Sequence, residues 1–89
     1  MVTVEFAPSL RRHVDCPPQA VASASVRAAL EAALAAAPAL SHYVFDDQRA
    51  IRKHVAVFIN DQMLRDRHQL DGLLVDGDRL LVIQALSGG

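Results

Sequence analysis

The chain has 89 residues, 52% of them hydrophobic but only 4% aromatic, and its formal net charge at pH 7 is −1. This length suits one domain with one modest aliphatic core, and the near-neutral charge gives no overall field that would favour nucleic acid or a membrane surface. No run of 18 apolar residues is long enough to span a bilayer, and the N-terminus lacks the features of a secretory signal, so we expect a cytoplasmic protein that binds neither nucleic acid nor membrane.

The first 22 residues predict a β-hairpin. Residues 2–6 (VTVEF) alternate apolar and polar side chains, which is the period of a strand with one buried face. Pro8 ends this strand because it has no N–H to donate to a neighbouring strand. Residues 11–18 are interpreted as a turn or loop, and residues 19–22 as a second, short strand.

A helix is predicted next. Ser25 is the expected N-cap, because its hydroxyl can accept a hydrogen bond from an N–H of the first helical turn. Pro38 is expected to end the helix. One apolar stripe at helical spacing comprises Val26, Ala29, Leu30, Ala33 and Leu34.

Residues 39–53 have the weakest pattern of the chain. We interpret them as a long connection with one irregular turn or a short helix. Asp46 and Asp47 are interpreted as a solvated acidic spot. The apolar residues expected to anchor this connection are Leu40, Tyr43, Val44, Phe45 and Ile51.

Strand patterns return at residues 54–59 (HVAVFI), where alternation places Val55, Val57 and Ile59 on one face and Ala56 and Phe58 on the other. Asn60 and Asp61 form the expected turn, because both residue types tolerate left-handed backbone. Residues 62–64 are expected to form a short edge strand.

The last part of the chain predicts a second tight turn and a final strand. Leu70, Leu73 and Leu74 are expected to reach the core from an irregular stretch. Residues 76–78 (DGD) form the turn, in which the glycine permits a positive φ. In the strand that follows, Leu80 and Val82 share one face, and Leu81 and Ile83 share the other.

The resulting order is strand, strand, helix, strand, short strand, strand. This order predicts an α+β domain, with a mixed sheet of four to five strands and one main helix packed on one face. The first and last strands both carry core-facing aliphatic residues, so both are expected to lie mid-sheet. We expect residues 1–86 to form the domain and residues 87–89 to form a flexible tail.

The chain ends in Gly88-Gly89, directly after the final strand. A tail without side chains can enter a channel that any Cβ would block. Since glycine makes up about 7% of residues on average, such a terminal pair arises by chance in roughly 0.5% of chains. An incidental frayed end is the alternative.

Other reactive residue types give no comparable pattern. Cys16 has no partner for an internal disulfide, and we expect an inert thiol there. The histidine spacings match no compact metal-ligand motif, so no metal site is predicted. The four histidines are His13, His42, His54 and His68.

The element order, residues 54–61 (HVAVFIND), the 76–78 turn and the terminal Gly88-Gly89 together resemble the ubiquitin-like β-grasp fold. The chain looks most like the ThiS/MoaD family of sulfur-carrier proteins, and within it the cysteine-biosynthesis carriers. Family members often have a proline in the last strand shortly before the diglycine. Residues 83–87 (IQALS) depart from that pattern, which should affect the stiffness of the tail and its fit to partners.

The resemblance implies that the chain is a carrier and not an enzyme. A ubiquitin-activating-like adenylating enzyme would use ATP to convert the Gly89 carboxylate into an acyl-adenylate. Sulfide or persulfide sulfur would then displace AMP, and the resulting thiocarboxylate would donate sulfur to a biosynthetic enzyme. Gly88 and Ser87 would extend the reach of Gly89. The carrier itself would bind no cofactor and no metal, and we expect a monomer when it is free.

The outer face of the sheet is the expected surface for these partners, because contiguous exposed apolar residues indicate an interaction site. A register shift of one residue would instead bury Phe58 in the core. The expected partner-binding residues are Phe58, Leu81, Ile83, Leu86 and Ser87.

Two other functions remain open at this point. A ubiquitin-like protein modifier would use the same adenylate to join Gly89 to target lysines. A noncatalytic β-grasp binding module would carry an incidental diglycine. The pathway also stays open among cysteine, thiamine, molybdopterin and related sulfur chemistry.

Overall fold

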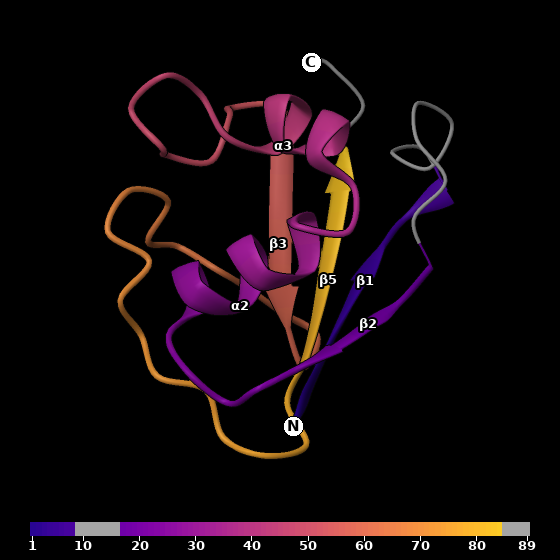
Figure 1. Cartoon of the computed structure of the whole chain (residues 1–89). Coiled ribbons are helices and arrows are strands. Elements are labelled where there is room, and N and C mark those ends of the chain that lie inside the picture. Colours follow the sequence, from indigo (N-terminus) through magenta and orange to yellow (C-terminus); the bar gives the residue numbers. More distant parts are fainter. Residues whose placement is uncertain (9–16, 85–89) are drawn as a thin grey trace.

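The computed structural model describes residues 1–8 and 17–84. These residues form a mixed five-stranded sheet with two helices over one face (Figure 1). The predicted α+β β-grasp fold is confirmed, with a second helix beside the expected one. The elements are β1 (Val2–Phe6), β2 (Gln19–Val21), α2 (Val26–Leu34), α3 (Pro38–Val44), β3 (Val55–Ile59), β4 (Gln62–Met63) and β5 (Arg79–Gln84).

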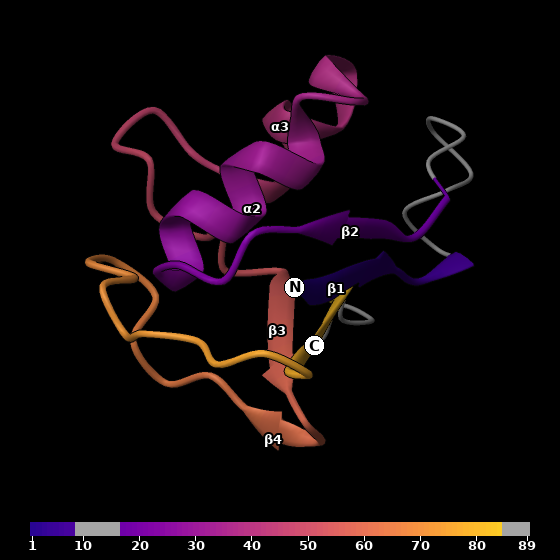
Figure 2. The same ribbon diagram turned by 60° about the horizontal axis from the view of Figure 1, so that its bottom comes forward.

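The strand order is β2-β1-β5-β3-β4. The central pair, β1 and β5, is parallel, and the other neighbouring strands are antiparallel. The expectation that the first and last strands lie mid-sheet is confirmed, as is the edge position of the short strand. Figure 2 shows α2 and α3 on the same side of the sheet.

The hairpin of β1 and β2 follows the sequence pattern. Val2 pairs with Val21, and Val4 pairs with Gln19. The alternate residues Val2, Val4 and Phe6 are all buried, whereas Thr3 and Glu5 are half-buried on the opposite face. The period-2 interpretation of this segment is therefore confirmed.

Helix α2 begins as expected but ends earlier. The Ser25 hydroxyl accepts a hydrogen bond from the Ala28 N–H at 3.1 Å, and all five residues of the predicted stripe are buried. The helix ends at Leu34, so the prediction that Pro38 ends it is wrong. Pro38 instead begins α3, because proline is favoured in the first helical turn, where its missing N–H costs no hydrogen bond.

The connection after α3 contains both confirmed anchors and a correction. Leu40, Val44, Phe45 and Ile51 are buried, but Tyr43 is 42% exposed, so its assignment to the core is wrong. The spacing explains this result, since Leu40 and Val44 lie four residues apart on the buried face of α3.

Asp46 has a structural role that the acidic-spot interpretation missed. Its carboxylate accepts hydrogen bonds from the N–H groups of Gln48 and Ala50, at 2.9 and 3.0 Å. The Ala50 N–H is the largest cause that lowers the pKa of this carboxyl group. Asp47, its neighbour, is exposed as expected.

The turn between β3 and β4 uses left-handed backbone at both predicted residues, with φ of 49° at Asn60 and 73° at Asp61. The Asn60 side chain also joins this turn to the one before β5. Its amide donates to the Asp78 carboxylate at 2.8 Å, and its oxygen accepts from the Arg79 N–H at 3.0 Å. Gly77 adopts the expected positive φ, at 94°.

The loop between β4 and β5 reaches the core at two of the three expected leucines. Leu70 and Leu74 are buried, but Leu73 is 84% exposed, so its assignment to the core is wrong. Leu73 lies in an isolated antiparallel bridge with Ser25, and successive residues of extended backbone face opposite sides, so Leu73 is exposed where Leu74 is buried. The Asp66 carboxylate holds the loop by accepting from the N–H groups of residues 68, 69 and 70.

Candidate functional site

The described structure ends at Gln84, and Ala85 and Leu86 separate this residue in the sequence from the predicted tail of residues 87–89. Leu86, Ser87, Gly88 and Gly89 lie outside the described residues. The structure therefore defines the strand that leads toward the tail and the surfaces around its last described residue, Gln84.

The strand that leads into the tail is the central strand of the sheet. β5 is hydrogen-bonded to β1 on one side and to β3 on the other. Val82 is fully buried and is opposite Phe6 and Val57 in the two neighbouring strands. β5 is therefore held on both sides as far as Val82, and its last residue, Gln84, is held by its pairing with Val55.

The predicted partner surface lies on the sheet face opposite the helices. Leu81 is 37% exposed and pairs with the half-buried Phe58, while Ile83 pairs with Ala56. The predicted register and shared face of Phe58, Leu81 and Ile83 are confirmed. Their role in binding partners stays a prediction.

Met63 belongs to the same surface, although the sequence analysis did not assign it there. It is 58% exposed and pairs with Phe58 across the β3–β4 hairpin. Directly paired residues project from the same face of a sheet. Met63, Phe58 and Leu81 thus form an apolar row across three strands, which we call the outer apolar row.

Polar groups surround one end of this row. Glu5 and Arg79 form an exposed ion pair at 3.7 Å. A cavity of about 330 Å³ lies here, lined in part by Thr3, Phe58 and Leu81. Hydrogen bonds, chiefly from the Val75 N–H and then from Asn60, lower the pKa of Asp78 nearby. An apolar centre with a polar rim is typical of a protein interface.

A second cavity, of about 650 Å³, lies where β5 ends. Its lining includes Gln84, the last described residue, together with Arg52 and Lys53. From the sequence alone, these two cations are expected, like the other scattered basic residues, to be solvated or to pair with acidic partners. The feature of the sequence that could have indicated a role is the run Arg52-Lys53-His54, which directly precedes β3, the strand that pairs with the last strand. The complete lining is His42, Tyr43, Asp46, Arg52, Lys53, His54, Val55 and Gln84.

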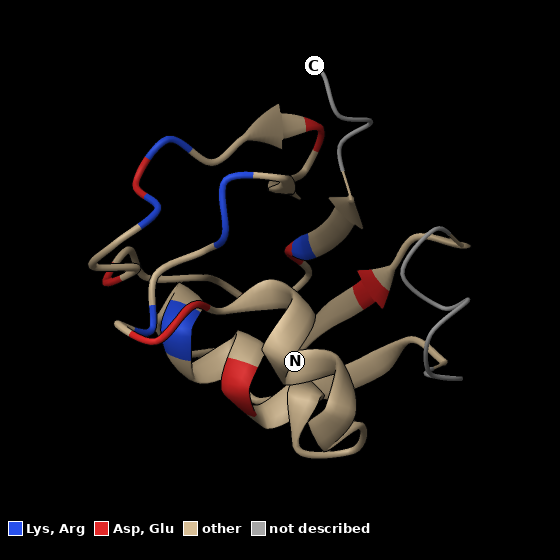
Figure 3. Ribbon diagram, turned by 90° about the horizontal axis from the view of Figure 1, so that it is seen from above, with Lys and Arg blue, Asp and Glu red and all other residues tan. Residues whose placement is uncertain are grey.

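Other functional classes find no support in the described part of the chain. Within it, no group of three or more potential ligands could hold a metal ion, and no helix is long and apolar enough to cross a membrane. Basic and acidic segments alternate along the ribbon (Figure 3). His42, His54 and His68 are exposed, whereas Cys16 and His13 lie outside the described residues.

Several solved structures share this fold. A chain of the BexX/CysO complex from Amycolatopsis orientalis has a TM-score of 0.81 and 22% identity, and the alignment covers 100% of each chain. CysO from Mycobacterium tuberculosis has a TM-score of 0.77 and 21% identity, over 97% of this chain and 100% of that one. SAMP1 from Haloferax volcanii has a TM-score of 0.76 and 24% identity, over 99% and 98%. These similarities establish the β-grasp fold.

The sequence itself identifies the family. No curated protein sequence matches the chain significantly. The ThiS family, however, matches residues 13–89, a span that includes β2 to β5, both helices and both terminal glycines. The chain therefore belongs to the ThiS family.

Proposed function

We propose that this protein carries sulfur as a thiocarboxylate on Gly89. The observation that supports this most strongly is the family match, which continues through the terminal diglycine. Carriers of the ThiS family are not catalysts but substrates of adenylating enzymes. The chain is accordingly a protein substrate and not an enzyme.

The proposed chemistry has two steps. The Gly89 carboxylate attacks the α-phosphate of ATP, which forms an acyl-adenylate and releases pyrophosphate. A hydrosulfide ion then attacks the acyl carbon, AMP leaves with the bond electrons, and a proton is released as the thiocarboxylate forms. If a persulfide supplies the sulfur, a thiol must afterwards reduce the acyl disulfide. Both steps use groups of the partner enzyme, so the carrier needs no base, metal or cofactor of its own.

The proposal places two physical demands on the carrier, and the described residues fit both. The domain must hold the start of the tail firmly, and β5 is the central strand of the sheet. The domain must also offer a surface by which partners recognise it, since a diglycine has no side chains. The outer apolar row, together with Ile83, is the proposed surface. We further propose that residues 87–89 act as a flexible tail on a monomeric domain and that the carrier acts in the cytoplasm.

ATP–pyrophosphate exchange tests the first step. A purified adenylating enzyme from the source organism should exchange label only when the carrier is present. Deleting Gly89, or replacing Gly88 with valine, should abolish exchange, because the acid group is displaced or the tail no longer fits a narrow channel. Both variants should unfold at the urea concentration of the unaltered protein, since the tail lies beyond the core. Full exchange by the Gly89 deletion would refute the proposal.

Intact mass measurements separate the carrier from the protein modifier, because both begin with the same adenylate. Replacement of one terminal oxygen by sulfur supports the carrier. Conjugates of higher mass that need Gly89 and contain target lysines support the modifier. Neither product, with an active adenylating enzyme and ATP present, would indicate a binding module with an incidental diglycine.

A further inference from the structure

The segment between α3 and β3 forms a turn that is fixed by several backbone contacts. The Arg52 N–H donates to the Val44 carbonyl at 2.9 Å, and the Val55 N–H donates to the Arg52 carbonyl at 3.0 Å. The Arg67 guanidinium donates to the carbonyls of both Arg52 and Val55. We call residues 52–54 (RKH) the basic turn, and all three of its side chains are exposed.

The basic turn carries positive charge that forms no salt bridge within the described part of the chain. Arg27 and Arg49 pair with Glu31, and Arg79 pairs with Glu5. No salt bridge to Arg52 or Lys53 occurs among residues 1–8 and 17–84.

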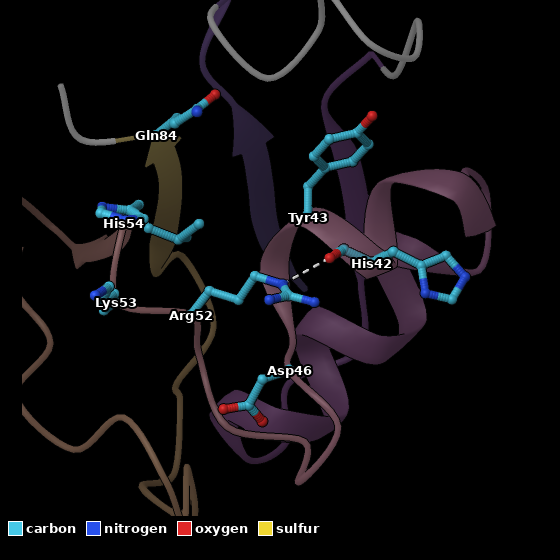
Figure 4. Close-up of a pocket in the computed structure, with 8 residues that line it drawn as sticks. His42, Tyr43, Asp46, Arg52, Lys53, His54 and Gln84 are labelled. Atoms are coloured by element: carbon cyan, nitrogen blue, oxygen red, sulfur yellow. Dashed lines mark hydrogen bonds between the residues drawn. The ribbon is translucent and has the colours of Figure 1, made fainter. Parts of the chain in front are cut away.

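The Arg52 side chain is nevertheless held in place. Its Nε–H donates to the His42 carbonyl at 2.8 Å (Figure 4). The acidic residue that lines the same cavity, Asp46, directs its carboxylate to the N–H groups of its own loop. The Arg52 charge also helps to lower the pKa of Asp46, after the larger contribution of the backbone hydrogen bonds, but the two side chains form no salt bridge. Arg52 therefore presents a held positive charge at the cavity, beside the exposed Lys53.

The position of the basic turn relative to the tail is set by strand register. Val55, which directly follows the turn, pairs with Gln84. Figure 4 shows His54 and Lys53 beside the end of β5 that bears Gln84. Five residues follow Gln84, and a fully extended chain of that length spans at most about 17 Å. An enzyme that acts on the Gly89 carboxylate must therefore come close to the basic turn.

From this geometry we propose that the basic turn docks on an acidic surface of the adenylating enzyme, one formed by Asp and Glu side chains beside the channel that admits the tail. This inference rests on the proposed function. Complementary charge at such a rim speeds encounter and fixes orientation more than it adds affinity. The turn would align the tail with the channel while the outer apolar row provides contact area.

We assign the turn to the adenylating enzyme because adenylation is the step that the carrier and the modifier share. The same enzyme must bring the tail carboxylate close to the phosphates of ATP, against the repulsion of like charges. An orienting contact made by the domain reduces the dependence of this step on the tail alone. Docking on a sulfur-accepting enzyme is the competing assignment.

Lys53→Glu is the cleanest test, because none of the described contacts depends on the Lys53 side chain. The assay is carrier-dependent ATP–pyrophosphate exchange with the purified adenylating enzyme. We expect kcat/KM for the carrier to fall about fivefold to tenfold at low salt, through a higher KM with kcat unchanged. The difference from the unaltered carrier should shrink at high salt, because salt screens charges separated by more than a few ångströms.

Arg65→Glu is the matched control. Arg65 is exposed, undergoes the same change of charge, and follows the edge strand β4, on the side of β3 away from β5. Its kcat/KM should stay within twofold of the unaltered value. Equal effects of the two substitutions would overturn the proposal, since they would reflect net charge alone. Unchanged adenylation of Lys53→Glu would also overturn the proposal. If this variant is adenylated normally but loses the later transfer of sulfur, the basic turn belongs to the interface with the sulfur-accepting enzyme instead. If the unaltered carrier supports no exchange at all, the proposed function itself fails.

Discussion

Replacing Leu30 with alanine should destabilise the fold strongly, whereas the same replacement at Leu73 should not. Leu30 is 0% exposed in the stripe of α2 that packs against the sheet, and Leu73 is 84% exposed in the loop before β5. Leucine to alanine removes three carbon atoms, which at about 0.8 kcal/mol each gives roughly 2.4 kcal/mol of lost burial. A partly collapsed cavity raises the expected cost for Leu30→Ala to about 3–4 kcal/mol.

Urea denaturation followed by circular dichroism measures both variants. A cost of this size corresponds to a urea midpoint lowered by about 1–4 M, which is a large part of the roughly 4–13 kcal/mol of total stability of a domain of this size. Leu73→Ala should stay within about 0.5 kcal/mol of the unaltered protein. A cost below 1 kcal/mol at Leu30, or equal costs at the two sites, would refute the placement of α2 and of the loop.

Three further predictions concern the turn before β5, the outer face and acid stability. Gly77→Ala should lower the free energy of unfolding by about 1 kcal/mol because of the φ of 94° at this position, although no atom blocks a Cβ there. Gly72→Ala is the control, since that position is also unobstructed but has no positive φ, and it should lower the free energy of unfolding by less than about 0.5 kcal/mol in the same urea assay. Leu81→Gln, which adds no charge opposite Glu5, should raise the KM for the carrier in pyrophosphate exchange at least about tenfold without shifting the urea midpoint by more than about 0.5 M, and an unchanged KM would exclude the outer apolar row from the interface. Backbone hydrogen bonds, first from Gln69, lower the folded-state pKa of Asp66, so its stabilisation is complete above the unfolded pKa of about 3.9 and is lost as the pH falls through the lower folded value. In urea titrations below pH 4, Asp66→Asn should flatten that loss, and an unaltered pH profile would contradict this role.

Local patterns predicted the parts of the fold in which one period extends over several residues. The alternation of residues 2–6 and the stripe from Val26 to Leu34 each specify a buried face without reference to the rest of the chain. The turn at Asn60-Asp61 was predictable from residue type alone, since Asn and Asp favour the left-handed backbone that the turn requires.

The errors fall where position depends on distant contacts. Leu73 pairs with Ser25, far away in the sequence, in an isolated antiparallel bridge, and successive residues of extended backbone face opposite sides, so Leu73 faces solvent while Leu74 is buried. The contacts of Arg27 also could not be predicted from local sequence. Its guanidinium donates to the carbonyls of Arg49, His68 and Gln69, which joins α2 to two loops that no local pattern connects.

The candidate site divides in the same way. Strand alternation predicted the shared face of Phe58, Leu81 and Ile83, but Met63 joins them only through the hairpin register. The basic turn has no periodic pattern, and its place beside the end of β5 follows from the pairing of Val55 with Gln84. Sequence reasoning can therefore identify the reactive end of the chain more readily than the surface that presents it.

The most direct test of the account is the mass of the C-terminal tryptic peptide after reaction with the adenylating enzyme, ATP and sulfide. Cleavage after Arg79 releases residues 80–89 (LLVIQALSGG), which contain neither methionine nor cysteine, so oxidation of those residues cannot imitate the gain of sulfur. The account predicts that one oxygen of this peptide is replaced by sulfur and that fragmentation assigns the change to Gly89. An unmodified peptide from a reaction in which the enzyme exchanges pyrophosphate with this carrier would contradict it.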